Sequence, residues 1–154
     1  MKTKALCLIL CALLLFPLLF TACGRHIEDT NGADTSLCAL TEEELLSKTA
    51  SYSSVGSLSS HVNGKQTLRV KKLSGVYAFN SYLAQSNSLT VTISTTLYAG
   101  NLRILLLCDG AHLADFTVNQ AETLTLQNAN GHRYEVRLAA ESAKLDAEVA
   151  FTEE

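Results

Sequence analysis

Apolar and polar residues alternate along the chain from about residue 61 to its end. Residues two apart point to the same face of a β-strand, so this alternation predicts strands with one buried and one exposed face. No long helical pattern falls between the alternating runs, which argues against a parallel sheet built from βαβ units. The alternation is clearest in the segments 68–71, 89–94, 133–138 and 144–151.

Turn residues separate these runs at regular intervals. Asn63-Gly64, Asp109-Gly110 and Asn130-Gly131 suit the positive φ angles of tight hairpin turns, and Gly100-Asn101 joins two further runs. The pattern predicts an all-β fold, namely an antiparallel β-sandwich of about eight short strands, with a small β-barrel as the alternative. The expected strands are 65–73, 76–83, 89–98, 101–108, 112–118, 122–127, 132–139 and 143–151.

One expected strand differs from the others. Residues 102–108 are apolar on both faces except at Arg103. A run of this kind predicts a central strand that is covered on both sides.

A short helix is expected before the sandwich. Thr41 lies three residues before Glu44, which is the spacing of a capping box, and Glu42 to Glu44 place negative charge in the first turn. A helix this short needs to dock on something or it frays. Serine dominates residues 51–60. We therefore expect a short helix and a Ser-rich linker, or an extended lead-in, over 41–60, and the β-sandwich domain over 61–154.

The first 22 residues differ from the rest. Lys2 and Lys4 precede an uncharged apolar run from Ala5 to Phe20, and Thr21-Ala22-Cys23 follow it. A basic start, an apolar run and small residues before a cut define a secretory signal peptide. The final residues resemble the lipobox of bacterial lipoproteins. That resemblance implies a signal peptide over 1–22 and lipidation of Cys23 by acyl chains. It also implies a protein held on the extracytoplasmic face of the cell membrane.

The segment 23–40 is predicted to be a disordered tether, because few of its residues are apolar. The whole chain has 12 Lys and Arg against 15 Asp and Glu, and loss of Lys2 and Lys4 with the signal makes the remainder more acidic. An acidic domain is a poor candidate for nucleic-acid binding.

Two cysteines remain beyond Cys23, and they are too few for a disulfide-framed scaffold. Cys108 ends an apolar strand and is expected to be a small core residue. Cys38 falls in the tether. A disulfide between Cys38 and Cys108 stays open as an alternative.

The histidines and carboxylates give no convincing catalytic or metal site. His61, His112 and His132 show no paired metal-ligand spacing, and His26 belongs to the tether. Asp109 and Asp115 are better explained by a turn and an exposed strand face than by a glycosidase pair. We expect no metal, no cofactor and no enzyme. The alternative is a small hydrolase-like secreted enzyme with its site in loops.

A basic cluster is the main candidate for binding. Lys65, Arg69, Lys71 and Lys72 lie close together in the sequence, and such a patch could attract an anionic membrane surface or polymer. The alternative is a solvated strand face. Together these features predict a lipid-anchored protein with a non-catalytic binding or structural role at the bacterial cell envelope. Its partner would be an envelope protein, an anionic polymer or a glycan.

Overall fold

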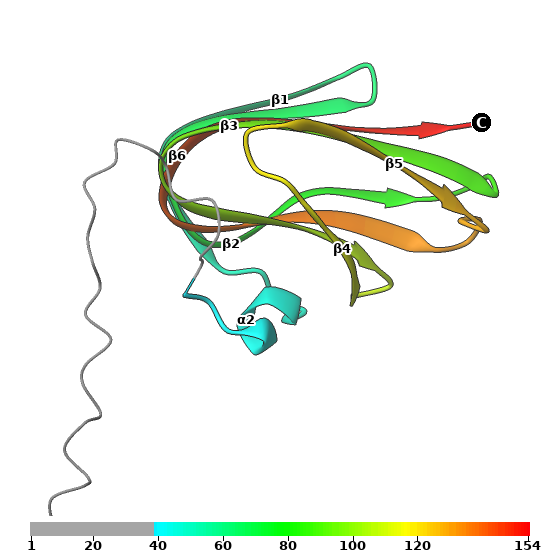
Figure 1. Ribbon diagram of the computed structural model, residues 1–154, viewed down its shortest axis with the longest axis horizontal. Coiled ribbons are helices and arrows are strands. Elements are labelled where there is room, and N and C mark those ends of the chain that lie inside the picture. The colour runs from blue at the N-terminus through cyan, green and yellow to red at the C-terminus, as the bar shows by residue number, and fades with distance from the viewer. Residues whose placement is uncertain (1–38) are drawn as a thin grey trace, which may run out of the picture. The chain divides into compact units, whose positions relative to one another are not determined.

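The computed structural model describes residues 39–154, which form a β-sandwich preceded by one short helix (Figure 1). The predicted signal peptide, Cys23, Cys38 and nearly all of the predicted tether lie outside the described residues. The elements are α2 (Glu42–Leu46), β1 (Tyr52–Val62), β2 (Lys65–Leu83), β3 (Ser88–Cys108), β4 (Ala111–Phe116), β5 (Ala121–Gln127) and β6 (Arg133–Glu153).

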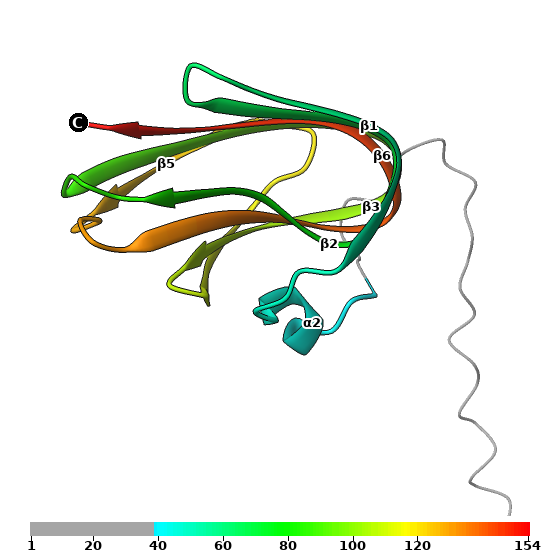
Figure 2. The same ribbon diagram turned by 180° about the vertical axis from the view of Figure 1, so that it is seen from behind.

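The two layers of the sandwich come from one antiparallel sheet that folds over on itself. Its strand order is β1-β2-β6-β3-β4. On the edge of β3 that faces away from β6, β5 pairs with the first part of β3 and β4 pairs with the last part. Strands β2, β3 and β6 each run through one layer, bend, and continue in the other (Figures 1 and 2). The all-β antiparallel sandwich predicted from the sequence is therefore confirmed.

The bends coincide with breaks in register. The β2–β6 register shifts between Val70 and Leu73, and the β3–β6 register shifts around Ala99. Gly75 and Gly100 adopt φ angles of 97° and 79° at these places. Bulges and glycines let a strand turn sharply while it keeps its neighbours. Each bend thus carries one continuous strand from one layer to the next.

This geometry corrects the predicted strand count. Six of the eight expected strands are the halves of β2, β3 and β6, and Gly100-Asn101 lies inside β3. Asn63-Gly64 and Asp109-Gly110 do form two-residue hairpin turns with positive φ. Asn130-Gly131 does not, because β5 pairs with β3 and not with β6. The sequence pattern shows where a strand bends but does not distinguish a bend from a turn.

The Ser-rich stretch is also corrected. Most of it belongs to strand β1, which pairs with β2 along its length, from Tyr52 opposite Gly75 to Val62 opposite Lys65. All of its residues are exposed, so they show no buried face that alternation could reveal. The sandwich therefore begins before residue 61, and the linker interpretation is wrong.

Helix α2 packs on the outer face of one layer. Leu45 is buried against Val76, Leu105, Leu107 and Ala139, apart from the main core between the layers. This explains why 102–108 is apolar on both faces, since Ile104 and its alternating neighbours fill the main core. The prediction of a strand covered on both sides is confirmed.

The helix ends are satisfied by side chains. The Thr41 hydroxyl accepts from the Glu44 amide, and Glu44 accepts from the Thr41 amide, which confirms the predicted capping box. The buried Arg137 donates to the carbonyl oxygens of Leu45 and Ser47 at 2.8 and 2.7 Å. These contacts hold a helix of only five residues in place.

Candidate functional site

A shallow trough of about 530 Å³ crosses the outer face of the layer that contains β1. Its floor consists of side chains from four neighbouring strands. Register places them in two rows that run across β1, β2, β6 and β3. One row is Ser60, Thr67, Glu148 and Ser94, and the other is Leu58, Arg69, Asp146 and Thr96.

Two ion pairs between β2 and β6 lie in the trough and at its edge. Lys65 lies 2.8 Å from Glu148, and Arg69 Nε donates to Asp146 Oδ1 at 3.1 Å. The Tyr98 hydroxyl donates to Asp146 Oδ2 at 3.2 Å. The hydrogen bond with Asp146, followed by its negative charge, raises the pKa of Arg69. Two cations and two carboxylates therefore balance one another along β2 and β6.

Hydroxyl groups line the remainder of this face. Ser60 and Thr67 share a hydrogen bond of 2.7 Å across β1 and β2. Further along, the threonine pairs Thr90–Thr125 and Thr92–Thr123 each lie 3.2 Å apart across β3 and β5. A face built in this way presents many donors and acceptors, and the charges of its two ion pairs cancel.

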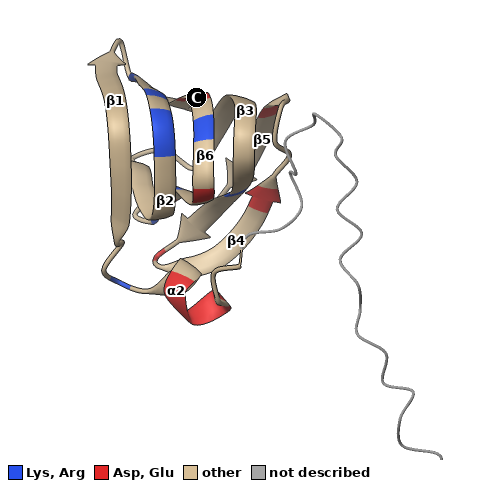
Figure 3. Cartoon of the chain, turned by 90° about the vertical axis from the view of Figure 1, so that its left-hand side faces the viewer, with Lys and Arg blue, Asp and Glu red and all other residues tan. Residues whose placement is uncertain are grey.

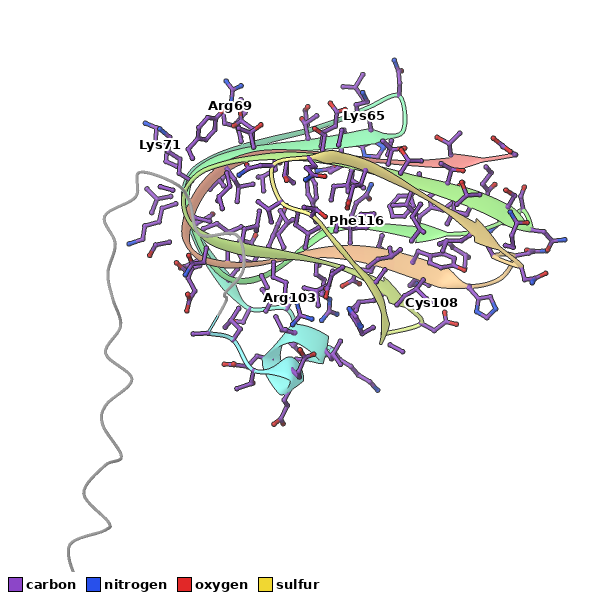
Figure 4. The ribbon with its side chains drawn as sticks, in the orientation of Figure 1. Lys65, Arg69, Lys71, Arg103, Cys108 and Phe116 are labelled. Atoms are coloured by element: carbon purple, nitrogen blue, oxygen red, sulfur yellow. The ribbon has the colours of Figure 1, made fainter. Side chains whose placement is uncertain are left out.

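The predicted basic cluster is only partly a set of unpaired cations. Lys65, Arg69 and Lys71 lie on the outer side of the same layer (Figure 4), and Figure 3 shows a basic segment of β2 next to a basic segment of β6, with an acidic segment further along β6. Lys71 and Lys72 are both exposed at the bulge of β2 and form no ion pair within residues 39–154. Binding of an anionic surface by this cluster stays a prediction.

The sequence did not reveal the acidic half of the trough. Asp146 is 77 residues from Arg69 along the chain, and only the antiparallel pairing of β2 with β6 brings them together. Register is set by tertiary pairing. The alternation does reveal that both residues lie on exposed faces.

The other histidines and carboxylates considered from the sequence are spread over separate parts of the fold. His61 Nδ1 lies 3.0 Å from Gln66 Oε1, and His112 Nε2 lies 3.2 Å from Asp115. Asp115 also accepts from Arg103, whose guanidinium bonds Glu42 of helix α2 at 2.7 Å. Arg103 of β3 thus attaches β4, through Asp115, and the helix, through Glu42.

One histidine does lie in a cluster. His132 Nδ1 lies 2.7 Å from Asp109 Oδ2, and Cys108 is close to both. The hydrogen bonds from His132 and from the Arg133 amide, in that order, lower the pKa of Asp109. Cys108 is half-buried beside the main core, as its position at the end of an apolar strand predicts.

No protein-family model and no curated protein match this sequence. Solved structures with similarity include a mutant family 29 carbohydrate-binding module, at 10% identity over 68% of this chain and 81% of that chain, with a TM-score of 0.34. A second is a family 36 module of a xylanase from the hindgut metagenome of Trinervitermes trinervoides, at 12% identity over 69% and 98%, with a TM-score of 0.35. A third is the β-glucosidase of Kluyveromyces marxianus in complex with glucose, at 15% identity over 64% and 13%, with a TM-score of 0.32. Similarity at this level does not identify a ligand for the present chain.

Within residues 39–154 there is no helix with the length and apolar character needed to span a bilayer.

Proposed function

We propose that this protein is a lipid-anchored, extracytoplasmic binding module that holds an uncharged saccharide in the trough across β1, β2, β6 and β3. The role is non-catalytic. The observation that carries the proposal is the chemistry of the trough, in which two balanced ion pairs lie among hydroxyl groups. The anchor rests on the lipobox-like residues Phe20 to Cys23.

Size and shape support a small extended ligand. Neighbouring strands lie about 4.8 Å apart, so the four strands span about 14 Å from β1 to β3. The volume of about 530 Å³ falls within the range of small-molecule sites. An oligosaccharide laid along the two rows of side chains would meet polar groups at each strand.

The chemistry of the trough also suits a polyol. Ion pairing holds the Arg69 guanidinium and the Asp146 carboxylate in fixed positions, and Tyr98 restrains the same carboxylate. Hydrogen bonds to charged groups are stronger than those between neutral groups. The side chain of Tyr98 is 54% exposed and Leu58 is 72% exposed, so apolar surface is available beside the polar rows.

Charge balance favours an uncharged ligand over an anionic polymer. Lys65 and Arg69 are each matched by a carboxylate, so an anionic ligand in the trough would meet a repelling carboxylate beside each of these two cations. A neutral saccharide gains the hydrogen bonds without this penalty.

Affinity electrophoresis of the purified protein in native gels tests the ligand. The gels contain glucomannan, xylan or dextran as neutral polysaccharides, or polygalacturonate as an anionic one. We expect retardation by at least one neutral polysaccharide. Asp146→Asn should weaken that binding about tenfold, because the negative charge that holds Arg69 in place is lost and one of the two oxygens that accept from Arg69 and Tyr98 becomes an NH2 donor.

The same substitution distinguishes the alternatives. Asp146→Asn leaves the trough net positive, so it would strengthen binding of an anionic ligand. Asp115→Asn makes the same charge change on β4 beside Arg103 and should leave retardation unchanged. Migration is compared with a gel that contains no polysaccharide, because both substitutions change the net charge. Absence of retardation of the wild-type protein in every neutral gel would refute the saccharide proposal, and equal retardation of all three proteins would place the ligand outside the trough.

The anchor has its own test. Cys23→Ala should abolish incorporation of a labelled fatty acid and move the protein out of the membrane fraction. Unchanged membrane retention of this variant would contradict lipid anchoring and would leave the trough experiment unaffected.

A further inference from the structure

A thiol, a carboxylate and an imidazole converge at the end of β3. Cys108 ends this strand, Asp109 begins the turn to β4, and His132 lies directly before β6. One ligand atom from each of these side chains lies within 4.8 Å of the other two. The cluster is separate from the trough, and Figure 4 shows Cys108 well away from Lys65 and Arg69.

Backbone hydrogen bonds hold the two segments together. The Asp109 amide donates to the Arg133 carbonyl at 2.8 Å, and the Arg133 amide donates to Asp109 Oδ1 at 2.9 Å. The positive φ of Asp109 in its two-residue turn aims the carboxylate across to the start of β6. The site is therefore formed by the fold and does not depend on movement of a long loop.

The donor set fits a particular class of metal. We propose that Cys108, Asp109 and His132 bind Zn²⁺, with the fourth position left to water. Zinc takes sulfur, nitrogen and oxygen ligands in tetrahedral geometry, at about 2.0–2.3 Å, and sites with three protein ligands keep an open position. Such bond lengths place ligand atoms roughly 3–4 Å apart. The cluster needs only small side-chain shifts to reach that spacing.

A second side chain supports the sulfur ligand. Tyr134 is opposite Cys108 in the β3–β6 pairing and is buried. A buried side chain next to a metal ligand is the kind of partner that orients the ligand and tunes its affinity.

Within the described part of the chain, a second histidine–carboxylate pair lacks a nearby thiol. His112 and Asp115 form a comparable pair at 3.2 Å on β4, and within residues 39–154 no group of three candidate metal ligands includes them. This pair provides a matched control, since it has the imidazole and the carboxylate but lacks the sulfur. The proposal revises the expectation of no metal, which rested on sequence spacing.

Titration of the full-length protein with Co²⁺ tests the site, because a thiolate bound to Co²⁺ gives a charge-transfer band in the near ultraviolet. We expect a band at one equivalent that Zn²⁺ displaces. Cys108→Ser and His132→Ala should abolish it, and His112→Ala should leave it unchanged. Tyr134→Phe should weaken Zn²⁺ binding by about tenfold to a hundredfold.

Three results would overturn the proposal. The first is the absence of a band in the wild-type protein, and the second is a band of equal intensity in Cys108→Ser, which would place the sulfur ligand on another cysteine. The third is a Cys38–Cys108 disulfide in protein isolated under non-reducing conditions, since it leaves no thiolate. Circular dichroism of each metal-free variant shows whether a lost band reflects a lost ligand or a lost fold.

Discussion

Replacing Gly100 by alanine should destabilise the sandwich more than the same change at a glycine with free space around it. Gly100 has a φ of 79° at the bend of β3, and an added Cβ would lie 2.5 Å from the Glu141 carbonyl oxygen and 2.6 Å from that of Ser142. Left-handed backbone costs a non-glycine residue about 1–2 kcal/mol. Displacing two backbone carbonyls adds about 1–3 kcal/mol. The expected loss in the free energy of unfolding is therefore about 2–5 kcal/mol.

Gly64 provides the matched control. Its φ is 74°, close to that of Gly100, but an added Cβ would have no neighbour within 4 Å. Gly64→Ala should therefore cost only the conformational part, about 1–2 kcal/mol. The difference between the two variants isolates the close approach of β6 to β3 at the bend.

Urea unfolding followed by far-ultraviolet circular dichroism measures both variants, since the chain has no tryptophan for fluorescence. In thermal melts, each kcal/mol corresponds to about 4 °C for a domain of this size. Equal losses in Gly100→Ala and Gly64→Ala, within about 0.5 kcal/mol, would refute the argument that tight packing between strands requires glycine at the bend.

Three further predictions concern helix α2. Leu45→Ala should cost about 2–4 kcal/mol in urea unfolding, because Leu45 is 1% exposed; a loss under 1 kcal/mol would mean that the helix does not dock as described. Arg137→Met leaves the carbonyls of Leu45 and Ser47 without their donor. We therefore expect a loss of about 2–3 kcal/mol in the free energy of unfolding and faster amide exchange in α2. Amide exchange at the wild-type rate would contradict a role of Arg137 in holding the helix. Hydrogen bonds from Thr41, first from its amide and then from its hydroxyl, lower the pKa of Glu44 from its ordinary value of 4.5. The cap should therefore be fully present above about pH 5 and be lost as the pH falls through the lowered pKa of Glu44, so amide exchange in α2 should become faster over that range. Glu44→Gln should remove this pH dependence of amide exchange. The same pH dependence in the variant would contradict the role of the capping box.

Local patterns in the sequence predicted much of the fold. Period-two alternation identifies every strand that has a buried face, and the capping box locates the start of α2 to the residue. Both signals depend on residues only a few positions apart in the sequence, so they can be recognised without the tertiary structure. Strand β1 has no buried side, and for that reason alternation missed it.

The candidate sites depended on long-range pairing. Asp146 meets Arg69 because β2 and β6 are antiparallel neighbours in a particular register. His132 meets Asp109 because β5 crosses to pair with β3, and β6 then starts beside the β3–β4 turn. Neither contact follows from local spacing.

The sequence by itself therefore determined the class of the fold, its short helix and the exposed side of most strands, because these follow from the alternation of single residues. Tertiary structure alone decided that three pairs of strands are continuous and bend at Gly75, Gly100 and their neighbours. It also decided which charges pair in the trough. The physical reason is that register and sheet order are set by the packing of the whole core, and the sequence of a single segment does not specify that packing.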